Sequence, residues 1–229
     1  MISENLDHIE ERICAACERA GRDRRSVTLI CVTKTKPLEM LQEAYEKGQR
    51  DFGENKVQEI CRKKPELEPD IRWHMIGHLQ RNKVRQLMGQ TVMIHSVDSL
   101  RLAETISAEA EKAGLVMPVL IEVNAAQEES KFGVSIEETE ELVRAISALR
   151  GVHIEGLMTI APYTDDPESN RGYFARLREL AVDIGQKCID NVSMGVLSMG
   201  MTGDFEVAIE EGATHIRVGT GIFGERIYT

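Results

Sequence analysis

The chain has 229 residues, 42% of them hydrophobic, which is enough to bury a substantial core and lies at the upper end of the range for one domain. Its 28 Lys and Arg residues against 38 Asp and Glu residues give a formal net charge of −10. Nucleic acids and anionic membranes bind to basic faces, so this acidic balance argues against both as partners.

The first 25 residues are rich in charge and predict an amphipathic helix. Apolar side chains recur in this segment at helical spacing: Ile2, Leu6, Ile9 and Ile13. The segment lacks the continuous apolar stretch of a signal peptide, and the chain has no run of about 20 apolar residues that could span a bilayer. We therefore expect a protein of the cytoplasm.

The five cysteines are odd in number and scattered along the chain. Cys14 and Cys17 have the spacing of a zinc-ligand pair, but no second such pair and no nearby histidine pair completes a site. We expect reduced thiols and no metal.

From residue 27 onward, short β-branched segments alternate with longer segments of helical periodicity, which is the pattern of repeated βα units. The predicted strands are residues 27–33, 51–53, 71–77, 92–95, 118–124, 154–160, 192–198 and 215–218. The predicted helices include residues 38–47, 57–62, 81–88, 99–113, 136–149, 167–188 and 204–211. This order predicts an α/β fold, a single (β/α)8 TIM-type barrel preceded by an N-terminal helix, as one domain over residues 1–229. A doubly wound open sheet is the alternative that periodicity alone does not exclude.

In such a barrel the loops after the strands present side chains to a ligand. The segment after the first predicted strand contains Lys34 and Lys36. A lysine at the end of an apolar strand is partly desolvated, which lowers the pKa of its amine and makes it a nucleophile toward an aldehyde. The sequence therefore predicts Schiff-base chemistry here, with solvated loop lysines as the alternative.

Period-two alternation does not separate the two lysines, because both have the same parity and point to the same side of the chain. Lys36 precedes Pro37 and belongs to the loop that leads to the next helix. Lys34 lies nearer the barrel mouth, so we favour Lys34 as the nucleophile.

The last two strands are followed by segments that suit a phosphate. Residues 219–221, Gly-Thr-Gly, could present backbone N–H groups and a hydroxyl, as loops after strands seven and eight of barrels often do. Residues 198–200 could complete such a cradle. Arg217 lies between Ile216 and Val218 inside the last strand, so its guanidinium needs a partner, either a structural carboxylate or a ligand.

These motifs together resemble the pyridoxal phosphate homeostasis proteins, which are also described as alanine racemase N-terminal-domain-like proteins. The resemblance spans nearly the whole chain from residue 27 onward, and the combination of motifs is far more specific than any one of them. The matching segments are VTKTKP at 32–37, FGENKVQE at 52–59, WHMIGHLQRNK at 73–83, GLMTI at 156–160, LSMGM at 197–201 and RVGTGIFG at 217–224.

The resemblance implies a fold-type III barrel that binds pyridoxal 5'-phosphate (PLP), with Lys34 as the internal-aldimine lysine. It also implies that Arg217 faces the pyridine nitrogen and that Asn55 lies beside the cofactor. The residues that it places around the phosphate are Ser198, Met199, Gly219 and Thr220. An arginine is always cationic, so it keeps the ring nitrogen unprotonated and weakens the ring as an electron sink.

The sequence does not assign a single role to residues 73–83. His74 is either a hydrogen-bonded core residue or part of the site. His78, Gln80 and Asn82 could line the mouth or bind a partner.

Fold-type III racemases resemble this barrel but add a β domain that supplies a tyrosine as second acid/base. The sequence ends five residues after Gly224, which leaves no room for such a domain. We therefore expect a monomeric carrier or buffer in PLP homeostasis, rather than an enzyme, with apo PLP-dependent enzymes as recipients. The alternatives are a low-activity one-domain racemase or lyase, with Tyr163, His78 or His153 as second base, and a barrel that binds a phosphate without covalent chemistry.

Overall fold

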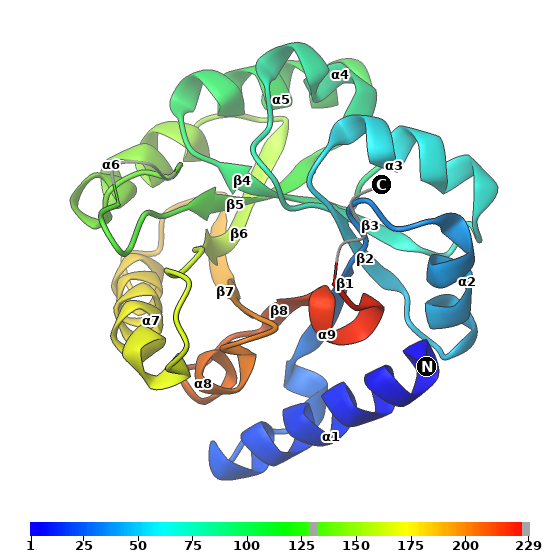
Figure 1. Ribbon diagram of the computed structural model, residues 1–229. Coiled ribbons are helices and arrows are strands. Elements are labelled where there is room, and N and C mark those ends of the chain that lie inside the picture. Colours follow the sequence, from blue (N-terminus) through cyan, green and yellow to red (C-terminus); the bar gives the residue numbers. More distant parts are fainter. Residues whose placement is uncertain (129–131, 226–229) are drawn as a thin grey trace.

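In the computed structural model, which describes residues 1–128 and 132–225, eight parallel strands form a closed barrel (Figure 1). The strands follow chain order around the barrel, and β8 pairs with β1 to close it. They are β1 Thr28–Val32, β2 Asp51–Glu54, β3 Arg72–Met75, β4 Met93–Val97, β5 Met117–Glu122, β6 Val152–Met158, β7 Val192–Met201 and β8 His215–Val218. The predicted (β/α)8 barrel is confirmed, and the open-sheet alternative is wrong because an open sheet would leave β1 and β8 unpaired.

Helices surround the barrel and connect its strands (Figure 1). They are α1 Ile2–Arg19, α2 Leu38–Glu46, α3 Val57–Lys63, α4 Val84–Leu87, α5 Leu100–Lys112, α6 Ile136–Ser147, α7 Arg171–Gly185, α8 Phe205–Glu210 and α9 Thr220–Phe223. Every predicted helix is present, although the segments predicted at 81–88 and 167–188 begin as 3-10 turns. The pattern misses α9, because four residues are too few to show a helical period. Within the described ranges, no helix is both long and apolar enough to cross a membrane.

β7 runs three residues beyond its predicted end at Ser198. The pattern predicts a loop at Gly200, and this prediction is wrong because β7 continues through that glycine, which lies close to α8. A Cβ added to Gly200 would lie 2.6 Å from the Cβ of Ala208, and the glycine has a φ of +89° that favours this residue type. Met201 still pairs with Arg217 of β8, so the loop after β7 begins at Thr202.

The N-terminal helix α1 packs outside the barrel against α8 and α9 (Figure 1). Its predicted apolar face is confirmed: Ile2, Leu6, Ile9 and Ile13 are all buried. On the same helix, the side-chain amide of Asn5 donates to the carbonyl of Ile222 at 2.8 Å. Since α9 begins at the carboxyl end of β8, α1 braces a segment of the barrel mouth from outside.

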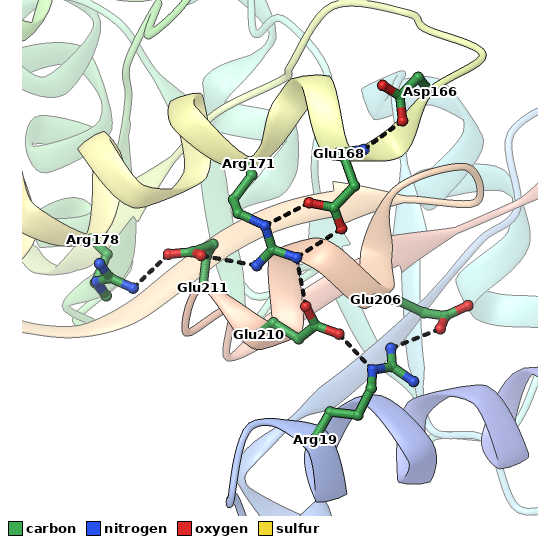
Figure 2. A network of polar contacts seen from close by, with 8 residues as sticks. All are labelled: Arg19, Asp166, Glu168, Arg171, Arg178, Glu206, Glu210 and Glu211. Atoms are coloured by element: carbon green, nitrogen blue, oxygen red, sulfur yellow. Dashed lines mark hydrogen bonds and ion pairs between the residues drawn. The ribbon is translucent and has the colours of Figure 1, made fainter.

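A network of ion pairs joins α1, α7 and α8 at the surface (Figure 2). Arg171, at the start of α7, contacts Glu210 at 2.7 Å and Glu211 at 3.0 Å. Arg19 of α1 contacts Glu206 at 2.9 Å and Glu210 at 2.6 Å. Partly exposed pairs contribute less than about 1 kcal/mol each at 25 °C, so we assign the network to holding α8 in register with its neighbours.

Candidate functional site

A cavity of about 440 Å³ opens at the carboxyl ends of the strands. This is the end of a (β/α)8 barrel where the loops after different strands meet, so the topology explains its position. Among its lining residues are five that the sequence predicts as site residues: Lys34, Asn55, Arg217, Gly219 and Thr220.

The two lysines after β1 have different surroundings although they share the same parity. Thr33 is fully buried and donates from Oγ1 to Glu54 Oε1 at 2.7 Å, which fixes the end of the strand. Lys34 follows, is half-buried and lines the cavity. The Nζ of Lys36 instead donates to carbonyls at the end of α9, at 3.0 Å to Phe223 and 2.9 Å to Gly224. Lys36 therefore ties the first loop to the last helix.

Arg217 reaches the cavity from the middle of β8, and the residue is only 4% exposed. Its Nη1 donates to Ser198 Oγ at 2.6 Å and its Nη2 donates to the carbonyl of Thr159 at 2.8 Å. Burial lowers the pKa of Arg217 to about 10, against the opposing charges of Glu122 and Asp204. The side chain therefore remains a cation at neutral pH, held by a hydroxyl and a carbonyl.

Thr202 lies at the centre of a group of donors beside the cavity. The backbone N–H groups of Gly219 and Gly221 reach its Oγ1 at 3.4 Å each, and Thr220 Oγ1 lies 3.2 Å away. An N–H···O bond usually measures 2.7–3.2 Å, so these N–H groups form only weak hydrogen bonds to Thr202 and are able to donate to a bound anion instead. Asp204, rather than Thr202, stands at the N-cap position of α8, and its side chain forms no hydrogen bond to the helix there.

Two predicted phosphate residues lie behind the cavity rather than on its lining. Ser198 is fully buried under Arg217, to which it is hydrogen-bonded. Met199 points the other way, into the apolar layer between the strands and the helices. Both lie inside β7, because that strand runs to Met201. Thr202 could not be predicted as a site residue for the same reason: a strand that ends at Ser198 would place Thr202 beyond the mouth of the barrel.

Asn55 lines the cavity just after β2. Its position depends on Gly77, because a Cβ added there would lie 2.5 Å from the backbone oxygen and 2.8 Å from the Cβ of Asn55. Any larger residue at position 77 would have to displace Asn55.

Four side chains whose roles the sequence leaves open lie in different surroundings. His74 is a buried, hydrogen-bonded residue of the barrel interior. His78 is partly exposed, stacks on Phe132 at a ring distance of 3.9 Å and lies 3.5 Å from Asp98. Tyr163 lines the cavity and is 94% exposed. His153, near the start of β6, bonds to Asn191 at the opposite end of the barrel.

Glu122 ends β5 as a buried carboxyl group, and its Oε2 has no hydrogen-bond partner within the described residues. Burial raises the pKa of Glu122 to about 7; the charge of Asp98 adds to the rise, and the Arg217 cation opposes it. Glu122 is thus the acid near Arg217 that changes protonation state around neutral pH.

Glu122→Gln should stabilise the cofactor-free protein at alkaline pH. A folded-state pKa of about 7, above the unfolded value of 4.5, favours the native state below pH 4.5, and this contribution is lost as the pH rises through 7. The loss amounts to about 3 kcal/mol between pH 4.5 and pH 8, and the glutamine variant avoids it. Urea unfolding at both pH values measures the difference, with Glu137→Gln on exposed α6 surface as the control. Parallel pH profiles for wild type and Glu122→Gln would contradict the assignment.

Comparison with known proteins identifies the family. A profile of the family described as "Alanine racemase, N-terminal domain" matches residues 5–227. A protein of Aquifex aeolicus named pyridoxal phosphate homeostasis protein is 49% identical over 226 residues, which cover 98% of each chain. The chain belongs to the pyridoxal phosphate homeostasis protein family.

Solved structures similar to this family member share its whole fold. A protein from Bifidobacterium adolescentis, described as unknown, superimposes with a TM-score of 0.92 at 37% identity, covering 97% of this chain and 94% of its own. PipY of Synechococcus elongatus, solved with PLP bound, gives a TM-score of 0.85 at 36% identity, covering 98% and 100%. The family resemblance and the fold that the sequence predicts are therefore confirmed.

Proposed function

We propose that this chain is a cytoplasmic, monomeric PLP carrier or buffer that acts in PLP homeostasis. The observation that supports it best is the convergence of an amine, a cation and a set of anion donors on one cavity: Lys34, Arg217 and the donors around Thr202. The names of its relatives and the PLP in PipY point the same way.

The cavity suits the three parts of the cofactor. When bound, PLP supplies an aldehyde that a lysine amine can capture reversibly, and a phosphate that anchors it. We assign the capture to Lys34 and the phosphate to Thr202, Gly219, Thr220 and Gly221, with Asn55 beside the ring. Ser198 then acts on the site through Arg217, and Met199 through the packing of β7.

The position of Arg217 supports a role in which the protein binds the cofactor without catalysing a reaction on a substrate. In this assignment it faces the ring nitrogen, and a guanidinium has only donors and remains charged. It therefore keeps the ring nitrogen unprotonated, which weakens the electron withdrawal that racemases and decarboxylases require.

The first test is the absorption spectrum of the protein with added PLP, before and after borohydride reduction, with mass mapping of the labelled peptide. We expect a visible band that reduction removes and a label on Lys34. A featureless spectrum with no labelled lysine would favour a barrel that binds phosphate without covalent chemistry.

Transfer to a recipient distinguishes a carrier from a passive binder. PLP-loaded protein is mixed with an apo PLP-dependent enzyme, and the recovery of that enzyme's activity is followed against an equal amount of free PLP. Faster loading from the protein than from free PLP supports the carrier, and loading that is slower in every recipient leaves only a buffer.

A low-activity racemase or lyase is the second candidate, and one observation favours it: Tyr163 lines the cavity with its ring exposed. Of the three residues considered as second base, it alone is among the lining residues described for this cavity. Turnover of amino acids by the loaded wild type, lost in Tyr163→Phe, would support this candidate.

A further inference from the structure

The barrel interior below Arg217 is polar at a level where such barrels usually carry branched aliphatic side chains. Three histidines, His74 of β3, His95 of β4 and His215 of β8, lie with their ring centres 5.1–6.2 Å apart. His74 and His95 are 3% and 0% exposed, so each buried ring nitrogen needs a hydrogen-bond partner.

Two of these histidines form a continuous chain of hydrogen bonds, which we call the polar relay: Ser198, His95, His74 and Asp51. Ser198 Oγ accepts from Arg217 and lies 2.9 Å from His95 Nδ1. His95 Nε2 lies 3.0 Å from His74 Nδ1, and His74 Nε2 lies 3.0 Å from Asp51 Oδ1.

At its far end the polar relay meets the Nε of Arg72, which donates to Asp51 Oδ1 at 2.8 Å. Asp51 and Arg72 begin β2 and β3, so they lie at the amino ends of the strands. The relay therefore runs from the cavity to the opposite end of the barrel.

One arrangement of protons satisfies the whole relay. Burial alone would raise the pKa of Asp51, but its bonds to His74 and Arg72 outweigh burial and bring it to about 2, so this carboxylate only accepts. His74 Nε2 must then carry a proton. If His74 is neutral, its Nδ1 accepts from His95 Nε2–H, and His95 Nδ1 accepts from the Ser198 hydroxyl.

The reversed arrangement fails at Ser198. A cationic His74 would donate from Nδ1 to His95 Nε2, so His95 would carry its proton on Nδ1 instead. Ser198 Oγ would then accept from two donors, one on His95 and one on Arg217. The Ser198 hydroxyl proton would then have no acceptor among its contacts in the described part of the chain. Burial is the main cause that lowers the pKa of His95 well below its usual value, and the nearby Arg217 cation adds to it, which also keeps His95 neutral.

We propose that His95 and His74 are positioning residues for Arg217. The negative charge of Asp51 polarises the hydrogen bonds through both histidines, which makes Ser198 Oγ a stronger acceptor and so fixes the guanidinium at the cavity. The hydrogen bonds of Arg217 in the described residues go to a hydroxyl and a carbonyl rather than to a carboxylate. Bonds that are polarised in one direction strengthen one another in a medium of low dielectric constant. The effect on the cofactor rests on the proposed function, in which Arg217 faces the ring nitrogen.

The first test needs neither a variant nor the cofactor. Long-range proton–nitrogen NMR of the cofactor-free protein, labelled with 15N-histidine, distinguishes the two neutral tautomers and the imidazolium. We expect His74 and His95 to be neutral and protonated on Nε2 at pH 7. A proton on Nδ1 of either residue would overturn the relay, whatever the protein does with PLP.

The second test measures the effect on the site. Asp51→Asn keeps an acceptor for His74 but removes the charge, and His95→Asn keeps an acceptor for Ser198 but cuts the link to His74. We expect each variant to raise the Kd for PLP about tenfold and to shift the visible band of the loaded protein. The matched control is His215→Gln, since His215 lies in the same layer and bonds only to its neighbour Thr214 among the contacts described.

Thermal melting of each cofactor-free variant is recorded in parallel to separate positioning from folding. Folded Asp51→Asn and His95→Asn proteins with wild-type Kd and spectrum would overturn the proposal. If wild type itself does not bind PLP, the proposed function fails, while the tautomer measurement still decides the relay.

Discussion

We expect Lys34→Ala to abolish covalent capture of PLP and to raise the Kd for PLP by roughly 100-fold, which corresponds to about 2.7 kcal/mol. The donors around Thr202 and the Arg217 cation remain in this variant, so weak non-covalent binding persists. Equilibrium dialysis measures the Kd, and borohydride trapping followed by peptide mapping measures the covalent fraction.

Lys36→Ala is the matched control for this prediction. It removes an amine two residues away and with the same parity, but one that donates to carbonyls at the end of α9. We expect its trapped fraction to equal that of wild type. The double variant Lys34→Ala/Lys36→Ala reports whether Lys36 captures the aldehyde when Lys34 is absent. Full trapping in Lys34→Ala that persists in the double variant would show that neither lysine is the nucleophile.

The fold could be predicted because its causes are local and periodic. Alternating βα segments set the order of the elements, and parallel strands in chain order close a barrel. The end of β7 could not be predicted, because it depends on elements that the pattern treats separately: Met201 pairs with Arg217 of β8, and Gly200 lies close to Ala208 of α8.

The candidate site could be predicted in part for a similar reason. Lys34 and Arg217 stand out in the sequence, since each places a charge on or beside an apolar strand. Thr202 does not stand out, because a threonine in a loop has no pattern of its own. His95 lies in a short segment that predicts only a strand. The chain of hydrogen bonds from Ser198 through His95 to Asp51 becomes visible only when four separate strands, β2, β3, β4 and β7, come together.

Lys63→Met should destabilise the protein by about 3–5 kcal/mol, because it breaks a buried ion pair on one side only. Lys63 is 1% exposed and donates from Nζ to Glu54 Oε1 at 2.7 Å and to the carbonyl of Thr33 at 2.9 Å. Glu54 is fully buried, and burial already raises its pKa against the opposing effects of Lys63 and Thr33. Urea unfolding at pH 8 measures the loss, with Lys64→Met as a control on the adjacent, more exposed lysine.

The second substitution Glu54→Gln decides where that loss comes from. It removes the buried negative charge that Lys63→Met leaves without a partner, and it keeps an oxygen that can accept from Thr33. The double variant Lys63→Met/Glu54→Gln should therefore recover most of the stability. In Lys63→Met alone, the further rise of the Glu54 pKa favours the native state at low pH, and this contribution is lost as the pH rises. The deficit of the single variant should therefore shrink from pH 8 to pH 5. A deficit that is independent of pH and persists in the double variant would assign the loss to the other contacts of Lys63, the ion pair with Glu59 at 2.8 Å and the bond with the Thr33 carbonyl. That bond supports the residue immediately before Lys34, so the same variant would then also lower the affinity for PLP.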